Sequence, residues 1–245
     1  MDTFENELHR EWPLPDAQWI LKQTWNHLLF AHWPVAIDRL RAAVPRFLEL
    51  DLFANEAWLS VTPFRVTDST PRGIPPLPVV SAFDEINVRT YVVYDGIPGV
   101  YFFSLDANSA MAVGGASTLF HLPYFLADIH ADDRRSQLSF RSRRRRSDGA
   151  EFDAQYSPAG AIFQPKAGTL EYFLTERYCL YTQDSSAHAY RVDIHHAPWE
   201  LQPAEAQLGG NTMADAAGFR LPSMAPLLHY ARRQDVRIWF PESLG

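Results

Sequence analysis

Cysteine and lysine are nearly absent from this chain of 245 residues, and both shortages restrict its chemistry. Cys179 is the single cysteine, which excludes an internal disulfide and any zinc site built from two or four thiolates. Lys22 and Lys166 are the only lysines, and the other basic residues are arginines. A guanidinium stays charged whereas a buried amine can lose its proton. A reaction that needs a free amine therefore has only two side-chain candidates.

Long apolar runs and a basic excess are also missing. No window approaches the roughly 18 consecutive apolar residues that a membrane span needs. Met1–Arg10 carries three acids and no apolar core of a secretory signal. The formal net charge of −7 disfavours nucleic-acid binding, which needs a basic surface to displace counterions from phosphates. We therefore expect a cytoplasmic protein without a membrane or nucleic-acid partner; whether it forms a homo-oligomer stays open.

The familiar catalytic and metal-binding motifs are missing as well. The chain has no G-x-S-x-G elbow, P-loop or G-x-G-x-x-G fingerprint. His195 and His196 are adjacent, so on a strand they point to opposite faces and cannot share one tetrahedral site. Cys179 lies between bulky apolar residues, which indicates a buried structural thiol. We expect neither a metal nor a cofactor.

Aromatic and apolar residues are plentiful and set in short, punctuated runs. Sixteen Phe, ten Tyr and seven Trp suit strands and a pocket wall better than a helical bundle. Trp25–Val35 reads mainly as a strand, with a helix as the alternative. Further strands are predicted at Trp58–Val66, Ile86–Tyr94, Val100–Leu105, Ser136–Arg144, Glu151–Ser157, Arg177–Gln183, His188–His195, Trp199–Gln202 and Leu228–Phe240. Short helices are predicted at Asp38–Val44, Ala107–Phe120 and Thr169–Leu174.

Several local features carry more specific expectations. Residues 1–15 read as an irregular arm of a single domain that spans residues 1–245. Pro63 implies a bend or an edge strand, and Asp106 is expected to cap the helix that follows it. Gly114 and Gly115 inside that helix suggest close backbone packing or a break. Pro and Gly crowd a long loop from Asp68 to Pro78, where function is often found.

Five phrases of the chain are similar to the YqjF-like family of uncharacterised bacterial proteins, over nearly the full length. They are LLFAHW (Leu28–Trp33), WLSVTPF (Trp58–Phe64), EINVRTYV (Glu85–Val92), GVYFFSLDA (Gly99–Ala107) and LPYFLADI (Leu122–Ile129). The stretch Phe83–Asp128 also resembles the core of the acetoacetate decarboxylases, more distantly. The resemblance implies an α+β fold: a conical, closed, predominantly antiparallel β-barrel with a few short helices around a cavity.

The resemblance also shows which chemistry the chain has lost. Acetoacetate decarboxylases carry two adjacent lysines directly after a proline; one forms a Schiff base and the other lowers its pKa. Here the proline is Pro123, and Tyr124 and Phe125 follow it. Neither side chain forms an imine, so Schiff-base decarboxylation is not expected.

Glu85, Asn87 and Arg89 are the first candidates for a binding site. Period-two geometry places the three on one face of a strand, and Tyr91 continues that face as an apolar residue. A covered face makes them cavity residues with perturbed pKa values. The alternative is a structural Glu85–Arg89 ion pair. In the comparison with the decarboxylases, Glu85 falls at a cavity glutamate.

The turn at Pro123 and an arginine run supply weaker candidates for binding or catalytic residues. His121 and Tyr124 flank the turn, and the Tyr124 phenol is suited to donate a proton or hydrogen bond. The alternative for Tyr124 is an aromatic that packs the barrel mouth. Arg141 and Arg143–Arg146 indicate a solvated hairpin end, with an anion or subunit contact as the alternative.

Two functions remain. The first is a protein that binds a small carboxylate-bearing, carbonyl-bearing or apolar molecule in its cavity, through Glu85, Asn87, Arg89, His121 and Tyr124. The second is an enzyme of lyase or hydrolase type, with Glu85 or Tyr124 as the acid–base group and Arg89 fixing a carboxylate. A cavity that holds Glu85, Arg89 and Tyr124 within hydrogen-bonding reach would favour the enzyme. A purely apolar cavity would favour apolar ligands.

Overall fold

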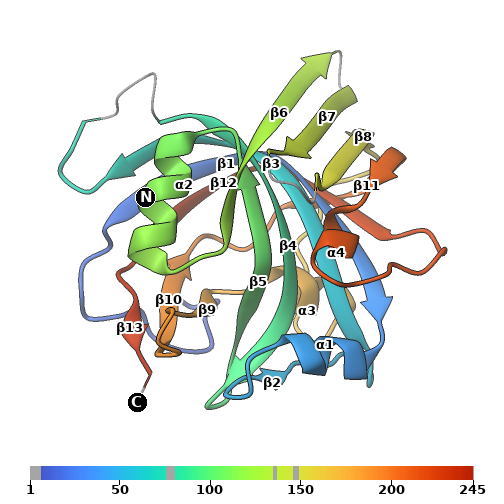
Figure 1. The fold of residues 1–245 in the computed structure, drawn as a ribbon. Coiled ribbons are helices and arrows are strands. Elements are labelled where there is room, and N and C mark those ends of the chain that lie inside the picture. The colour runs from blue at the N-terminus through green and yellow to red at the C-terminus, as the bar shows by residue number, and fades with distance from the viewer. Residues whose placement is uncertain (1–6, 76–80, 135–136, 146–148, 245) are drawn as a thin grey trace.

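The computed structural model of the chain describes residues 7–75, 81–134, 137–145 and 149–244 and is dominated by strands (Figure 1). The strands are β1 Leu21–Val35, β2 Glu49–Leu50, β3 Ala57–Pro71, β4 Phe83–Tyr94, β5 Ile97–Ala107, β6 Tyr124–Arg134, β7 Gln137–Arg144, β8 Glu151–Pro158, β9 Cys179–Gln183, β10 Ala189–His195, β11 Leu201–Asn211, β12 Leu227–Ile238 and β13 Glu242–Ser243. The helices are α1 Ile37–Ala43, α2 Ala110–Phe120, α3 Leu170–Thr175 and α4 Met213–Ala216.

The strands form one sheet that closes on itself in two ways. Strands β12, β1, β3, β4 and β5 are shared by both closures. One closure runs back from β5 to β12 through β9 and β10, and the other through β6, β7, β8 and β11. Every pairing is antiparallel except β5–β6 and β5–β9. The predicted closed, mainly antiparallel barrel with few short helices is confirmed, with parallel pairing confined to β5.

Strand β4 is covered on both faces because it belongs to both closures, and each closure covers one of its faces. Ile86 and Val88 pack into an apolar core with residues of β6, β7 and β8. Glu85, Asn87 and Arg89 point the other way, and all three are buried. In Figure 1, α2 lies on one side of β4 and β5, whereas β8, β11 and α4 lie on the other. The expectation that the polar face of this strand is covered is therefore met.

A bulge in β1 changes which of its residues face the cavity. Leu21, Gln23 and Trp25 line the cavity, but after His27 the cavity residues are Leu28 and Phe30. His27 has a positive φ of 55°, and the β1–β3 register shifts between Asn26 and Ala31. An extra residue in one strand reverses the alternation beyond it.

The bulge in β1 also explains how β3 can contain Pro63. Strand β3 pairs with β1 and β4, so it is not an edge strand. Pro63 pairs with Ile86 of β4 and faces the interrupted part of the β1 register, where no ladder hydrogen bond from its nitrogen is required. Of the two alternatives for Pro63, the edge strand is therefore wrong.

The turn that joins β4 to β5 is tight. Asp95 and Gly96 join β4 to β5, and both have positive φ, 49° and 75°. Two such residues are typical of the type I′ turn that matches the twist of paired strands. The strand interpretation of Trp25–Val35 is also confirmed, since β1 covers all of it.

Two local predictions around α2 are wrong. Asp106 does not cap the helix, because β5 continues through it; Ser109 is the cap and its side chain accepts from Ala112 N. Gly114 and Gly115 neither break α2 nor touch other elements, since a Cβ at either position would meet no atom within 4 Å. Sequence reasoning also missed β6, which follows the turn at Pro123.

The arm predicted at the N-terminus is irregular from residue 7 to residue 20. The Pro-rich loop is shorter than expected, because β3 extends to Pro71; Pro76 and Pro78 lie outside the described residues. Within the described residues, no helix is long and apolar enough to cross a membrane.

Candidate functional site

A cavity of about 100 Å³ lies inside the closure formed through β9 and β10. Its wall is mostly apolar, and the polar side chains come chiefly from β4. Helix α2 contributes Ala116 and Phe120 to the wall. The lining residues are Leu21, Gln23, Trp25, Leu28, Phe30, Thr62, Phe64, Glu85, Asn87, Arg89, Phe102, Leu105, Ala116, Phe120, Leu122, Tyr124, Leu180, Val192, Ile194, Trp199 and Ile238.

Glu85 and Tyr124 form a hydrogen-bonded pair in this wall. The Tyr124 hydroxyl donates to Oε2 of Glu85 over 2.8 Å, and Asn87 also hydrogen-bonds the Glu85 carboxyl. Burial raises the pKa of Glu85 to about 7, although both hydrogen bonds oppose the rise. Burial and the neighbouring carboxyl raise the pKa of Tyr124 above its usual value. Near neutral pH the Glu85 carboxyl is therefore poised between its acid and base forms, while Tyr124 stays a donor.

Arg89 belongs to the same wall but not to that pair. Its Nη2 donates to the carbonyl of Leu174 over 3.5 Å, and its guanidinium lies 5.4 Å from the centre of the Phe30 ring. The ion pairs found among the described residues include none between Arg89 and Glu85. The geometry therefore does not match the structural ion pair that was the alternative for these residues.

Three buried polar atoms of the cavity-lining residues have no hydrogen-bond partner among the described residues. They are Oδ1 of Asn87, Nε of Arg89 and Nε1 of Trp199. Buried polar groups in folded proteins are satisfied in the great majority of cases, and each unsatisfied one costs about 1–3 kcal/mol. They are one acceptor and two donors, each on a residue that lines the cavity.

The residues after Pro123 lie on opposite faces of β6. Tyr124 points into the cavity, whereas the ring of Phe125 lies 3.9 Å from the Arg144 guanidinium. Lys22 and Lys166 are both exposed, and neither lines the cavity. The cavity wall among the described residues therefore contains no amine that could form an imine.

His121 is not brought to the cavity with the other predicted residues. It ends α2 in the left-handed conformation, with φ of 53°. Its carbonyl accepts from Thr182 Oγ1 over 2.6 Å, and its ring packs on Tyr190 with centroids 5.0 Å apart. It lines a separate surface depression with Thr182 and Asp184. The prediction placed His121 beside Tyr124 in one site, but the turn directs the two side chains apart.

The arginine run is divided between the two faces of β7. Three exposed members pair with acids of neighbouring strands: Arg141 with Asp153, Arg143 with Glu151 and Arg145 with Asp128. Arg144 is buried and pairs with Asp106, and Arg146 lies outside the described residues. The exposed charges are thus locally balanced.

No group of three His, Cys, Asp or Glu side chains in the described part of the chain is arranged to hold a metal ion. Cys179 is buried, and burial raises the pKa of its thiol to about 12. A thiol in this state is a poor nucleophile.

Sequence reasoning missed the cavity residues that come from β1, β3 and the segment after β10. Gln23 accepts from Trp25 Nε1 over 2.8 Å, and Thr62 lies 3.1 Å from the Ser60 hydroxyl. Trp199 lines the cavity from the segment between β10 and β11. Period-two alternation alone would have found Thr62, but Trp199 gave no local signal.

Comparisons with known proteins agree with this architecture. The profile of the DUF2071 family, described as "Uncharacterized conserved protein", matches residues 22–235. The "Uncharacterized protein YqjF" of Bacillus subtilis (strain 168) is 50% identical over 226 residues, which are 92% of this chain and 93% of that protein.

Two solved structures share the fold at low sequence identity. Acetoacetate decarboxylase from Legionella pneumophila matches with a TM-score of 0.64 and 13% identity, over 96% of this chain and 93% of that one. The enduracididine biosynthesis enzyme MppR complexed with pyruvate matches with a TM-score of 0.62 and 12% identity, over 94% and 92%. The chain belongs to the DUF2071 family, and its barrel has the fold of the acetoacetate decarboxylases.

Proposed function

We propose that this protein binds a small molecule bearing a carbonyl or carboxylate group in the cavity lined by Glu85, Arg89 and Tyr124, without forming a Schiff base. The three unpartnered polar atoms in the cavity wall carry the proposal. An apolar ligand would leave them unsatisfied, whereas carbonyl and carboxylate oxygens are acceptors suited to N–H donors of this kind.

The size of the cavity limits the ligand. Its volume of about 100 Å³ is somewhat below the roughly 150 Å³ of an apolar cavity that admits benzene. Ligands of about six heavy atoms or fewer are therefore expected. The structural neighbour MppR has been observed with pyruvate, a molecule in this range, which supports pyruvate as a first probe for this chain.

Pyruvate and acetone are expected to raise the midpoint of thermal unfolding in a concentration-dependent way. A ligand at 100 times its Kd stabilises the folded state by about 2.7 kcal/mol. Ala116→Phe, which fills the cavity from α2, should abolish the shift. Gly115→Ala is the matched control, since a Cβ there meets no atom within 4 Å. Shifts that survive in Ala116→Phe, or no shift with any small carbonyl compound, would contradict the proposal.

Acid–base catalysis is the second candidate, and the pKa of Glu85 near 7 favours it. A carboxylate with a pKa close to the working pH is suited to remove a proton beside a carbonyl. In D₂O the protein should then accelerate exchange of the methyl protons of pyruvate, as followed by proton NMR. Glu85→Gln should reduce the acceleration by about 10²–10⁴-fold. If exchange is equally fast with and without protein under conditions where pyruvate binds, catalysis is contradicted and only the binding function stands.

A further inference from the structure

Four arginines are buried in the described part of the chain, and they differ in whether an acid lies beside the guanidinium. They are Arg10, Arg89, Arg144 and Arg177. Buried charges in proteins are normally paired, because taking an isolated ion out of water is very costly. The question for each is which acid balances its charge.

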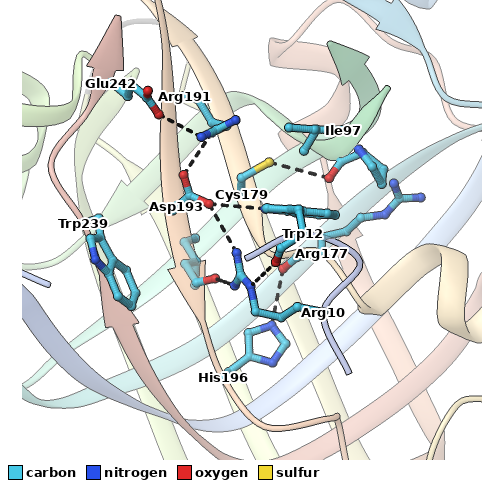
Figure 2. A network of polar contacts seen from close by, with 12 residues as sticks. Arg10, Trp12, Ile97, Arg177, Cys179, Arg191, Asp193, His196, Trp239 and Glu242 are labelled. Atoms are coloured by element: carbon cyan, nitrogen blue, oxygen red, sulfur yellow. Dashed lines mark hydrogen bonds and ion pairs between the residues drawn. The ribbon is translucent and has the colours of Figure 1, made fainter. Parts of the chain in front are cut away.

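Three of the four are balanced by an acid. Arg10 lies 3.3 Å from Asp193, Arg144 lies 2.7 Å from Asp106, and Arg177 lies 2.6 Å from Asp51. Figure 2 shows Arg10 directed at Asp193 between β10 and the N-terminal arm. The fold thus supplies a carboxylate wherever it buries these guanidinium groups.

Arg89 is the exception. No acid lies within ion-pair distance of it among the described residues, and its Nε has no hydrogen-bond partner. The ionisable groups that act on it are Tyr91, which also hydrogen-bonds its side chain, and Arg177. Burial raises the pKa of Tyr91, so its phenol stays neutral, and Arg177 repels the guanidinium.

The histidine beside Arg89 is neutral and cannot balance its charge. His32 is fully buried, its Nδ1 lies 3.2 Å from the Tyr91 hydroxyl, and its ring lies 6.2 Å from that of His229. Burial, and then Arg89 and His229, hold the pKa of His32 well below its usual value. Tyr91 and the two histidines lie outside the cavity lining and supply no counter-charge to Arg89, so an anion in the cavity is left to balance it.

We propose that Arg89 is a carboxylate-binding residue, so that the ligand of the cavity is a small organic acid whose carboxylate supplies the missing counter-charge. A planar carboxylate can accept from two N–H groups of a guanidinium, and Nε is one of the donors left over here. The inference rests on the proposed function and narrows it, because a cavity could bind neutral carbonyl compounds without using Arg89.

Pyruvate and pyruvamide separate the inference from the proposed function. The two molecules have the same number of heavy atoms and differ in charge. Isothermal titration calorimetry on the full chain should give at least about 10-fold tighter binding of pyruvate than of pyruvamide. In Arg89→Met this preference should disappear, while pyruvamide affinity changes little. Arg233→Gln, an exposed arginine on β12, is the matched control and should keep the preference.

The possible outcomes are distinguishable. Equal binding of pyruvate and pyruvamide to the unmodified protein overturns the carboxylate assignment and leaves the proposed function standing. A pyruvate preference that survives in Arg89→Met also overturns the assignment. Failure of both molecules, and of acetone, to bind overturns the proposed function itself. Arg89→Met is expected to fold, because it removes a buried charge that no acid among the described residues balances.

Discussion

Asp106→Asn is expected to lower the free energy of unfolding by about 3–5 kcal/mol. Arg144 donates to both carboxyl oxygens of Asp106 over 2.7 Å, and the side chains are 3% and 0% exposed. Removing the Asp106 charge takes from the buried guanidinium the carboxylate that it contacts twice, so less of the cost of desolvating it is offset. The loss would be a large share of the roughly 5–15 kcal/mol that stabilises a typical domain.

Chemical unfolding in urea, followed by tryptophan fluorescence, measures this effect. Asp128→Asn is the matched control, since Asp128 pairs with the neighbouring Arg145 at 2.6 Å but both side chains are 56% exposed. An exposed pair contributes about 0–1 kcal/mol. Replacing the pair together, as Asp106→Leu with Arg144→Met, should recover stability relative to Asp106→Asn, because no charge is then left buried. Similar losses in Asp106→Asn and Asp128→Asn would refute the argument.

The Asp106–Arg144 pair also marks the limit of what the sequence predicts. Its partners are 38 residues apart in the chain, and each sits in a pattern with a plausible local explanation. Asp106 before a helical stretch reads as a cap, and Arg144 in an arginine run reads as solvated. Only the pairing of β6 with β7 and of β5 with β6 brings the two together. Contacts of this kind depend on topology, which local patterns do not encode.

Structural features that depend on a single strand were predicted well from the sequence. Alternation along Glu85, Asn87 and Arg89 assigns all three to one face, because adjacent side chains of a strand always point to opposite sides. Tyr91 indicated that this face is covered, as the structure has it. The bulge at His27 breaks the same rule in β1, so the cavity face of that strand could not be read by alternation. Tyr124 was singled out by the resemblance to the acetoacetate decarboxylases. Its hydrogen-bond partner Glu85 is 39 residues away in the chain.

The stability of the protein should fall between pH 5 and pH 8 through Glu85, and Glu85→Gln should remove this fall. The folded pKa of Glu85 is raised to about 7 from its usual 4.5. Between these values the folded state holds a proton that the unfolded state has released, so stability decreases as pH rises. A shift of this size corresponds to about 2–3 kcal/mol over that range.

The comparison of Glu85→Gln with the unmodified protein isolates this contribution from other titrating groups. Their difference in unfolding free energy should change by about 2–3 kcal/mol from pH 5 to pH 8, in favour of the variant at pH 8. The glutamine keeps an oxygen that can accept from Tyr124 and carries no charge to desolvate. Glu205→Gln, at an exposed position of β11, should leave the profile unchanged. A constant difference between Glu85→Gln and the unmodified protein would mean that the Glu85 carboxyl ionises in the cavity as readily as in water, and that neither acid–base role proposed for it has a physical basis.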